Sequence, residues 1–148
     1  MSGRAFLSLG ANLGDRRAAL GAARAALIDT PGVRLAACSA VIETAPVDVL
    51  EQPPFLNQVL AVDTTLTPRA LLEACLGIER QLGRDRTAGP PHGPRTLDVD
   101  LLLFEGRTLD EPGLTLPHPR LAARPFFLAL CDAAGAPPAW IPQPAFAS

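Results

Sequence analysis

The order of strand-like and helix-like segments is the feature that most restricts how this chain can fold. Apolar residues at helical spacing lie between Asp15 and Pro31 and again between Thr67 and Gly83. Four apolar segments typical of strands surround them, over residues 4–9, 33–43, 55–62 and 96–104. The predicted order is therefore β-α-β-β-α-β, which is the ferredoxin-like arrangement. We expect an α+β fold with an antiparallel sheet and with helices packed on one face.

Local signals place the ends of the two helices. Asp15 and Thr67 have side-chain oxygens that can cap a first helical turn, and Pro68 stands where a helix tolerates proline best. A Pro-Gly pair stops the first helix, and Gly83 is the natural end of the second.

The segments between and after these elements lack a regular pattern. The GANLG segment at residues 10–14 matches no phosphate-binding loop and is expected to be a strand-to-helix turn. A hairpin turn is expected at residues 105–107, and a helix after Pro125. Prolines predict irregular structure in residues 45–54, 84–94 and 110–119, and a peripheral tail from residue 135.

Composition excludes several classes of protein. The chain has 148 residues, 48% of them apolar, which predicts a single domain over residues 1–148. Its net charge of −2 provides no basic field for nucleic acid or anionic membranes. No apolar run approaches the ~20 residues of a membrane span, and the three cysteines form no CxxC pair. We therefore expect a cytoplasmic protein with reduced thiols and without a nucleic-acid or membrane partner.

The sharpest chemical signal is the pair Asp98 and Asp100 in the last predicted strand. Residues two apart in a strand share a face and lie ~7 Å apart, so both carboxylates point one way. The alternate residues, from Leu97 to Leu103, then point into the core. Two carboxylates on one wall can hold Mg²⁺ and leave positions open for water and phosphate. The alternative is a solvated strand face, because so short a motif recurs by chance.

Arginines gather just before this strand. Arg80, Arg84, Arg86 and Arg95 lie within sixteen residues that contain one acidic residue, Asp85. Guanidinium groups bind phosphates well, and carboxylates, Mg²⁺ and arginines together are typical of phosphoryl-type transfer. Arg80 taken alone is better explained as a surface residue.

Two further groups of residues have competing interpretations. His118 lies among prolines with Arg120 and Arg124, which fits either a rigid phosphate-binding corner or a turn with exposed charges. Phe55 and Asn57 share a strand face, and a ring beside an amide suits a flat heterocycle. Taken alone, this second pair is better explained by core packing and a strand end.

From about residue 6 to residue 130, the chain resembles the 6-hydroxymethyl-7,8-dihydropterin pyrophosphokinase family of folate biosynthesis. The most specific match is the run GPRTLDVD at residues 93–100. The other matching blocks, in the same order, are LSLGANLG at 7–14, ET at 43–44, QPPFLN at 52–57, GRDR at 83–86 and LPHPR at 116–120, followed by Arg124 and Phe126.

The resemblance implies transfer of diphosphate from ATP to the hydroxymethyl group of a reduced pterin, with release of AMP. It implies that Asp98 and Asp100 hold two Mg²⁺ ions and act in catalysis with Arg84 and Arg95. The residues implied at ATP are Glu79, Arg84, Arg86, Arg95, Thr115, His118 and Arg124. The residues implied at the pterin are Thr44, Val47, Phe55, Asn57, Asp98 and Phe126, with the two phenylalanine rings on either side of the pterin.

The resemblance also implies that the segments 45–54 and 83–94 close over the substrates. The sequence departs from the family in the second of these, where His92 replaces a tryptophan found in many relatives and the loop is one residue longer. We expect a monomer whose partners are its two substrates. Two other functions stay open from the residues alone: another Mg²⁺-dependent, nucleotide-using transferase of the D-x-D type, and a non-catalytic nucleotide-binding module.

Overall fold

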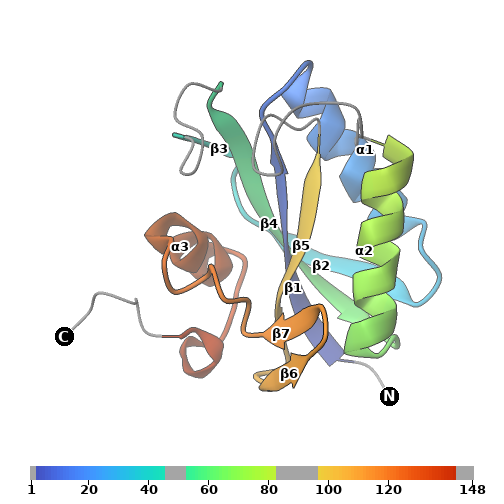
Figure 1. Ribbon diagram of the computed structural model, residues 1–148, viewed down its shortest axis with the longest axis vertical. Coiled ribbons are helices and arrows are strands. Elements are labelled where there is room, and N and C mark those ends of the chain that lie inside the picture. The colour runs from blue at the N-terminus through green and yellow to red at the C-terminus, as the bar shows by residue number, and fades with distance from the viewer. Residues whose placement is uncertain (1–2, 46–52, 83–96, 143–148) are drawn as a thin grey trace.

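The computed structural model describes residues 3–45, 53–82 and 97–142 (Figure 1). In chain order, its elements are β1 (Gly3–Ala11), α1 (Arg16–Ile28), β2 (Val33–Cys38), β3 (Ile42–Thr44), β4 (Phe55–Thr64), α2 (Pro68–Leu82), β5 (Asp98–Phe104), β6 (Leu109–Glu111), β7 (Leu114–Leu116), α3 (Pro125–Ala133) and a 3-10 turn, η1 (Pro138–Trp140).

The main sheet has the strand order β2-β4-β1-β5. β3 pairs with the first residues of β4, and β2 pairs with the last residues of β4. All of its pairings are antiparallel. If β2 and β3 are counted as one interrupted strand, this is the order of a split β-α-β-β-α-β unit. The predicted α+β class with an antiparallel sheet is confirmed.

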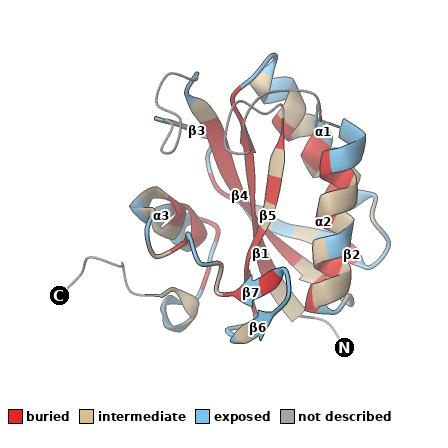
Figure 2. Ribbon diagram, in the orientation of Figure 1, coloured by how far each residue is buried: buried red, intermediate tan, exposed pale blue. Residues whose placement is uncertain are grey.

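Helices cover both faces of the sheet, whereas the sequence predicted one covered face (Figures 1 and 2). Leu7 and Leu9 of β1 pack in the core beneath α1 and α2, while Phe6 points to the opposite core beneath α3. Phe6 and Leu7 are both fully buried. Strands that are apolar on both faces need cover on both sides, and α3 provides the second layer.

The predicted strand over residues 33–43 is divided into β2 and β3. Ala36 is an extra residue in the pairing with β4, and residues 39–41 interrupt it. Ser39 fills the interruption: its Oγ accepts a hydrogen bond from Val59 N (2.9 Å), and its carbonyl accepts one from Gln58 Nε2 (2.7 Å). These bonds satisfy the backbone where the edge strand bends.

A bulge also changes the side-chain pattern of β5. Its pairing with β1 skips Leu102, because Phe6 lies opposite Leu103 and Leu7 lies opposite Leu101. An extra residue reverses the alternation of side chains beyond it. Leu103 therefore packs in the core beneath α3, not with Val99 as the sequence predicted.

Two expectations for the last third of the chain were wrong. Residues 110–116 are not irregular, because β6 and β7 form a hairpin there, whereas residues 117–119 belong to no strand or helix, as predicted. The predicted turn at 105–107 exists, with Phe104 O accepting a hydrogen bond from Arg107 N (2.9 Å), but the strand after it pairs with β7 and not with β5. The described part of the tail, residues 135–142, is not peripheral, since the Trp140 ring packs edge-on against Phe6 with centroids 6.1 Å apart.

The predicted helix starts are confirmed. Asp15 Oδ1 accepts a hydrogen bond from Ala18 N and Thr67 Oγ1 accepts one from Ala70 N, both at 3.1 Å. The predicted end at Gly83 lies outside the described residues. Among the helices of the described part, none combines the length and apolar character needed to cross a membrane.

All three cysteines are free in the structure. Burial raises the pKa of Cys75 and of Cys131 to about 12, whereas Cys38 is exposed.

Candidate active site

Strand register gathers the predicted site residues on one face of the sheet. In an antiparallel sheet, directly opposed residues share a face. Gly10 lies between Asn57 of β4 and Asp98 of β5. In the next row on that face, Ser8 lies between Val59 and Asp100. Neighbouring strands are ~4.8 Å apart, so this register places Asn57 and Asp98 roughly 10 Å apart across Gly10.

The two aspartates point the same way, as predicted. Both are partly exposed, while Leu97 and Val99 are buried in the core on the opposite face. The register and the α3 core contacts place the aspartates on the face that α3 covers, near the end of the sheet where β3 ends and β4 begins. Figure 1 shows these strand ends. Partial exposure keeps both carboxylates accessible to a charged ligand.

Gly10 forms the floor between the amide and the carboxylates. It lies within β1, which runs through Ala11, so the predicted turn begins later than the sequence indicated. A Cβ at Gly10 would come within 3.0 Å of Asn57 Oδ1. A side chain here would therefore displace Asn57. The sequence could not predict this need for a glycine, because it depends on the pairing of β1 with β4.

Thr44, Phe55 and Asn57 form one polar and aromatic group beside this floor. Thr44 of β3 pairs with Phe55 of β4, and Asn57 Nδ2 donates a hydrogen bond to Thr44 Oγ1. Asn57 is buried and Phe55 is half-buried. This bond uses one amide hydrogen of Asn57, and its remaining polar atoms suit the edge of a heterocycle.

The backbone holds His118 next to β5. His118 N donates a hydrogen bond to Leu102 O, the carbonyl of the bulge residue, at 2.9 Å. His118 Nδ1 accepts one from Arg120 N at 3.1 Å, so the neutral ring carries its proton on Nε2.

Electrostatics keep the ring of His118 neutral at pH 7. Burial lowers the pKa of His118 below 6.5, the nearby Arg120 and Arg124 lower it further, and Asp100 opposes them. His118 therefore presents a neutral Nε2–H donor, and its interaction with Asp100 brings the two predicted phosphate-side residues into one neighbourhood.

The start of α3 brings two more predicted residues to this face. Arg124 is the N-cap residue of α3, and Phe126 lies in its first turn, where its ring packs against Phe127 with centroids 4.4 Å apart. Phe126 is partly buried against the core that α3 makes with the sheet. A phenylalanine from α3 and one from β4 thus belong to the same covered face.

Comparison with known proteins gives this arrangement a family. The model of the 7,8-dihydro-6-hydroxymethylpterin-pyrophosphokinase (HPPK) family matches residues 6–134. The chain belongs to this family.

Individual relatives agree. A 2-amino-4-hydroxy-6-hydroxymethyldihydropteridine pyrophosphokinase from Methylorubrum extorquens is 46% identical over 125 residues, which are 84% of this chain and 78% of the relative. One from Bacillus subtilis is 40% identical over 129 residues, 87% of this chain and 76% of the relative. The chain is therefore an ATP-dependent pyrophosphokinase of folate biosynthesis, as the sequence predicted, and neither alternative function is favoured.

A solved structure confirms the fold. The crystal structure of Plasmodium falciparum HPPK-DHPS with pteroate, a triple mutant, aligns with a TM-score of 0.67 at 13% identity. The alignment covers 90% of this chain and 40% of that longer one.

Two residues that the HPPK resemblance placed near the nucleotide lie on other elements than the sheet face of the aspartates, on α2 and β7. Glu79 is buried on α2, and its Oε2 accepts a hydrogen bond from Val99 N at 2.7 Å, at the free edge of β5. Thr115 is exposed on β7, opposite Asp110. Glu79 thus joins α2 to β5 at the residue between the two aspartates, and the nucleotide-side role of Glu79 and Thr115 stays a prediction. Four predicted site residues lie outside the described part of the chain: Val47, Arg84, Arg86 and Arg95.

The donor set of this HPPK site fits Mg²⁺ that is shared with a substrate. Within residues 3–45, 53–82 and 97–142, no three His, Cys, Asp or Glu side chains gather closely enough to hold a metal ion. Asp98 and Asp100 thus offer two carboxylates, without a third such side chain in that part. Mg²⁺ is commonly held by one or two carboxylates, with waters and substrate phosphates completing its shell.

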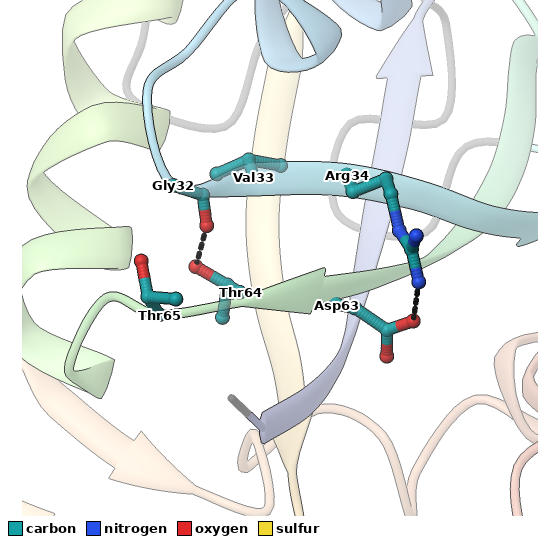
Figure 3. A pocket seen from close by; sticks show the side chains of 6 residues that line it. All are labelled: Gly32, Val33, Arg34, Asp63, Thr64 and Thr65. Atoms are coloured by element: carbon teal, nitrogen blue, oxygen red, sulfur yellow. Dashed lines mark hydrogen bonds and ion pairs between the residues drawn. The ribbon is translucent and has the colours of Figure 1, made fainter. Parts of the chain in front are cut away.

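A separate hollow of about 290 Å³ lies at the opposite end of the sheet (Figure 3). It is lined by the start of β2 and the end of β4, including Arg34, Asp63 and Thr64. Thr64 Oγ1 donates a hydrogen bond to Gly32 O (2.7 Å), and Asp63 pairs with Arg34. These polar groups satisfy one another, and among the described residues none that was predicted for the HPPK site lines this hollow.

Proposed function

We propose that this chain transfers diphosphate from ATP to the hydroxymethyl group of 6-hydroxymethyl-7,8-dihydropterin and releases AMP. The observation that carries the proposal is the row Asn57–Gly10–Asp98, in which an amide that suits a heterocycle and a carboxylate that suits a metal ion share one face. The names of the relatives supply the pterin, and the row supplies a place where a ring and a triphosphate would meet.

The pterin would occupy the Asn57 side of the row. Asn57 and Thr44 would hydrogen-bond its edge, and Phe55 and Phe126 would stack on its two faces. The backbone near Val47 would complete this side. Because Gly10 has no side chain, the ring would lie close to the sheet with its hydroxymethyl arm toward Asp98.

The triphosphate of ATP would occupy the aspartate side. Asp98 and Asp100 would hold two Mg²⁺ ions, which, when bound, offset the negative charge of the phosphates. His118 Nε2–H and the Arg124 guanidinium would donate to phosphate oxygens from the α3 side. Additional nucleotide contacts are proposed for Glu79, Arg84, Arg86, Arg95 and Thr115.

The reaction would be an in-line displacement at the β-phosphorus. The pterin hydroxyl oxygen forms a bond to that phosphorus, the bond to the oxygen bridging the α- and β-phosphates breaks, and AMP leaves with that oxygen. The side chains align attacker and leaving group and stabilise the charge that moves toward AMP. Asp98 is the candidate acceptor of the hydroxyl proton.

We further propose that the whole chain is one domain, working as a monomer in the cytoplasm. The two cores meet at a single sheet, so the described elements share one folding unit.

One experiment tests the proposed function directly. The purified chain is incubated with ATP, Mg²⁺ and 6-hydroxymethyl-7,8-dihydropterin, and the nucleotide products are separated. We expect AMP and the pterin diphosphate in equal amounts. ADP as the only nucleotide product, or no product, would overturn the proposal.

A further inference from the structure

Arg16 lies at the start of α1, directly after the β1–α1 turn. The Asp15 cap fixes the first turn of this helix and with it the direction in which Arg16 leaves the backbone. From its sequence, Arg16 looks like one of several arginines on the outer surface of α1. The structure instead turns its side chain toward β3 and β4, and only 29% of that side chain is exposed.

One nitrogen of Arg16 bonds to both β3 and the residue before β4, close to where β3 ends and β4 begins. Arg16 Nη1 donates to Glu43 Oε2 at 3.0 Å and to Pro54 O at 2.9 Å. Glu43 is the middle residue of β3, and Pro54 directly precedes β4. The next pair along these strands is Thr44 and Phe55, so the contact lies one residue away from the proposed pterin side.

A second side chain, from the β1–α1 turn that precedes Arg16, supports this contact. Asn12 is buried, and its Nδ2 donates to Pro53 O at 3.0 Å. Proline has no N–H, so the carbonyls are the only backbone hydrogen-bonding groups that Pro53 and Pro54 offer. The β1–α1 turn binds the first of them and the first residue of α1 binds the second, immediately before Phe55.

These contacts matter more for position than for stability. The Arg16–Glu43 pair is partly exposed, and such pairs contribute only about 0.2–1 kcal/mol. A displacement of roughly 1 Å in a substrate-holding group, however, can cost about 100-fold in rate. Phe55 directly follows Pro54 in the chain, and Thr44 directly follows Glu43. Loss of the two Arg16 hydrogen bonds would therefore move both Phe55 and Thr44.

We propose that Arg16 is a positioning residue for the pterin side of the site, acting through Glu43 and Pro54. This inference rests on the proposed function for the identity of the ligand. Arg16 fixes the entry of β4 and the end of β3 relative to β1, and so sets the spacing of Phe55, Thr44 and Asn57.

Binding measurements on matched variants test this role. Arg16→Ala is compared with Arg17→Ala, since Arg17 is exposed and makes no hydrogen bond or ion pair with the described residues. We expect R16A to raise the dissociation constant of 6-hydroxymethylpterin about 5- to 30-fold. R17A should bind like the wild type, and a non-hydrolysable ATP analogue with Mg²⁺ should bind all three proteins equally.

Arg16→Lys provides the rescue. Both contacts come from one nitrogen, so a single ammonium can restore much of the grip, and R16K should bind pterin more tightly than R16A. Equal weakening of pterin and nucleotide in R16A, or no difference between R16A and R17A, would overturn the inference. If the wild type forms no AMP, the proposed function fails, while the comparison of R16A with R17A still tests the position of Phe55 through pterin binding.

Discussion

At the scale of single residues, two carboxylates and one absent side chain define the proposed site. Asp98 and Asp100 share a face because they are two residues apart in a strand, and Gly10 leaves the space between Asp98 and Asn57 open. His118 lies near Asp100 because its backbone N donates a hydrogen bond to Leu102 O, and Arg120 N donates one to Nδ1 of its ring. Each of these residues is placed by backbone geometry, so substitutions should change chemistry without changing the fold.

We expect Asp98→Ala and Asp100→Ala each to lower AMP formation by about 1000-fold, because each removes charge that would hold Mg²⁺ against the phosphates. Initial rates at saturating ATP and pterin measure the effect, and circular dichroism checks the fold. Asp132→Asn, at an exposed carboxylate of α3, is the control and should keep full activity. Unfolding of either alanine variant would make the aspartates structural residues instead.

Phe55→Ala should weaken pterin binding more than ATP binding. The ring offers a stacking surface to the pterin, and an aromatic contact of this kind contributes about 0.5–1.5 kcal/mol beyond the area it buries. Titrations of 6-hydroxymethylpterin and of an ATP analogue give the two dissociation constants. Phe55→Tyr retains the ring and should bind pterin normally, and equal weakening of both ligands by F55A would contradict the stacking role.

At the scale of elements, bulges and breaks in the strands decide which side chains lie on each face of the sheet. The bulge at Leu102 leaves Asp98 and Asp100 on the α3 face while moving Leu103 to that same face, where it packs under α3. The break between β2 and β3 gives the edge strand two short pieces, and only the second pairs with Phe55. The η1 turn closes the lower part of the α3 core with Trp140 (Figure 1).

Trp140 should anchor this last element. Trp140→Ala is expected to lower the free energy of unfolding by roughly 2 kcal/mol, less than for a fully buried tryptophan because its ring is partly exposed. Gly106→Ala should also destabilise, since Gly106 has φ 87° and a Cβ there would come within 2.7 Å of Trp140 Cδ1. Urea unfolding followed by circular dichroism measures both effects.

Gly135→Ala separates the two reasons why Gly106→Ala should destabilise the fold, which are backbone strain at positive φ and the contact of the new Cβ with Trp140. Gly135 has φ 97°, yet a Cβ there meets no atom within 4 Å, so this variant reports backbone strain alone. In the wild type, G106A should lower the free energy of unfolding more than G135A does. In a W140A background, the two substitutions should lower it equally. An unchanged cost of G106A in that background would mean that Trp140 does not pack on Gly106 in solution.

At the scale of the whole molecule, the proposed site lies at one end of the sheet, and ion pairs join the strands at the other end. At the end away from the site, Asp63 of β4 binds Arg4 of β1 at 2.6 Å and Arg34 of β2 at 3.5 Å (Figure 3 shows the Arg34 pair). The hydrogen bond from Arg4, assisted by Arg34, holds the pKa of Asp63 below its usual value of 3.8. Three strands are joined there by a single carboxylate.

Stability should therefore depend on pH through Asp63. A carboxyl group whose pKa is lower in the folded state stabilises the fold above pH 3.8, and this contribution disappears as the pH falls through the lower folded pKa. Asp63→Asn should cost roughly 0.5–1 kcal/mol at pH 7 and almost nothing near pH 2. Denaturant unfolding of both proteins at the two pH values measures the difference, and a constant difference would contradict the ion pair.

Much of this protein could be predicted from the sequence alone. The helix starts at Asp15 and Thr67, the antiparallel α+β class, the aspartate pair and the family all follow from local patterns, because caps, strand periodicity and short motifs depend on near neighbours. The residues matched to the family by motif include both sides of the site, even where their neighbours in space were unknown.

Only the tertiary structure decided which side chains meet. Pairing register set Gly10 between Asn57 and Asp98, a bulge moved Leu103 to the other core, and α3 covered the second face. The turn of Arg16 from the α1 surface toward Glu43 and Pro54 has the same origin. Register, bulges and layer packing are settled by contacts between segments distant in sequence, so no local pattern contains them.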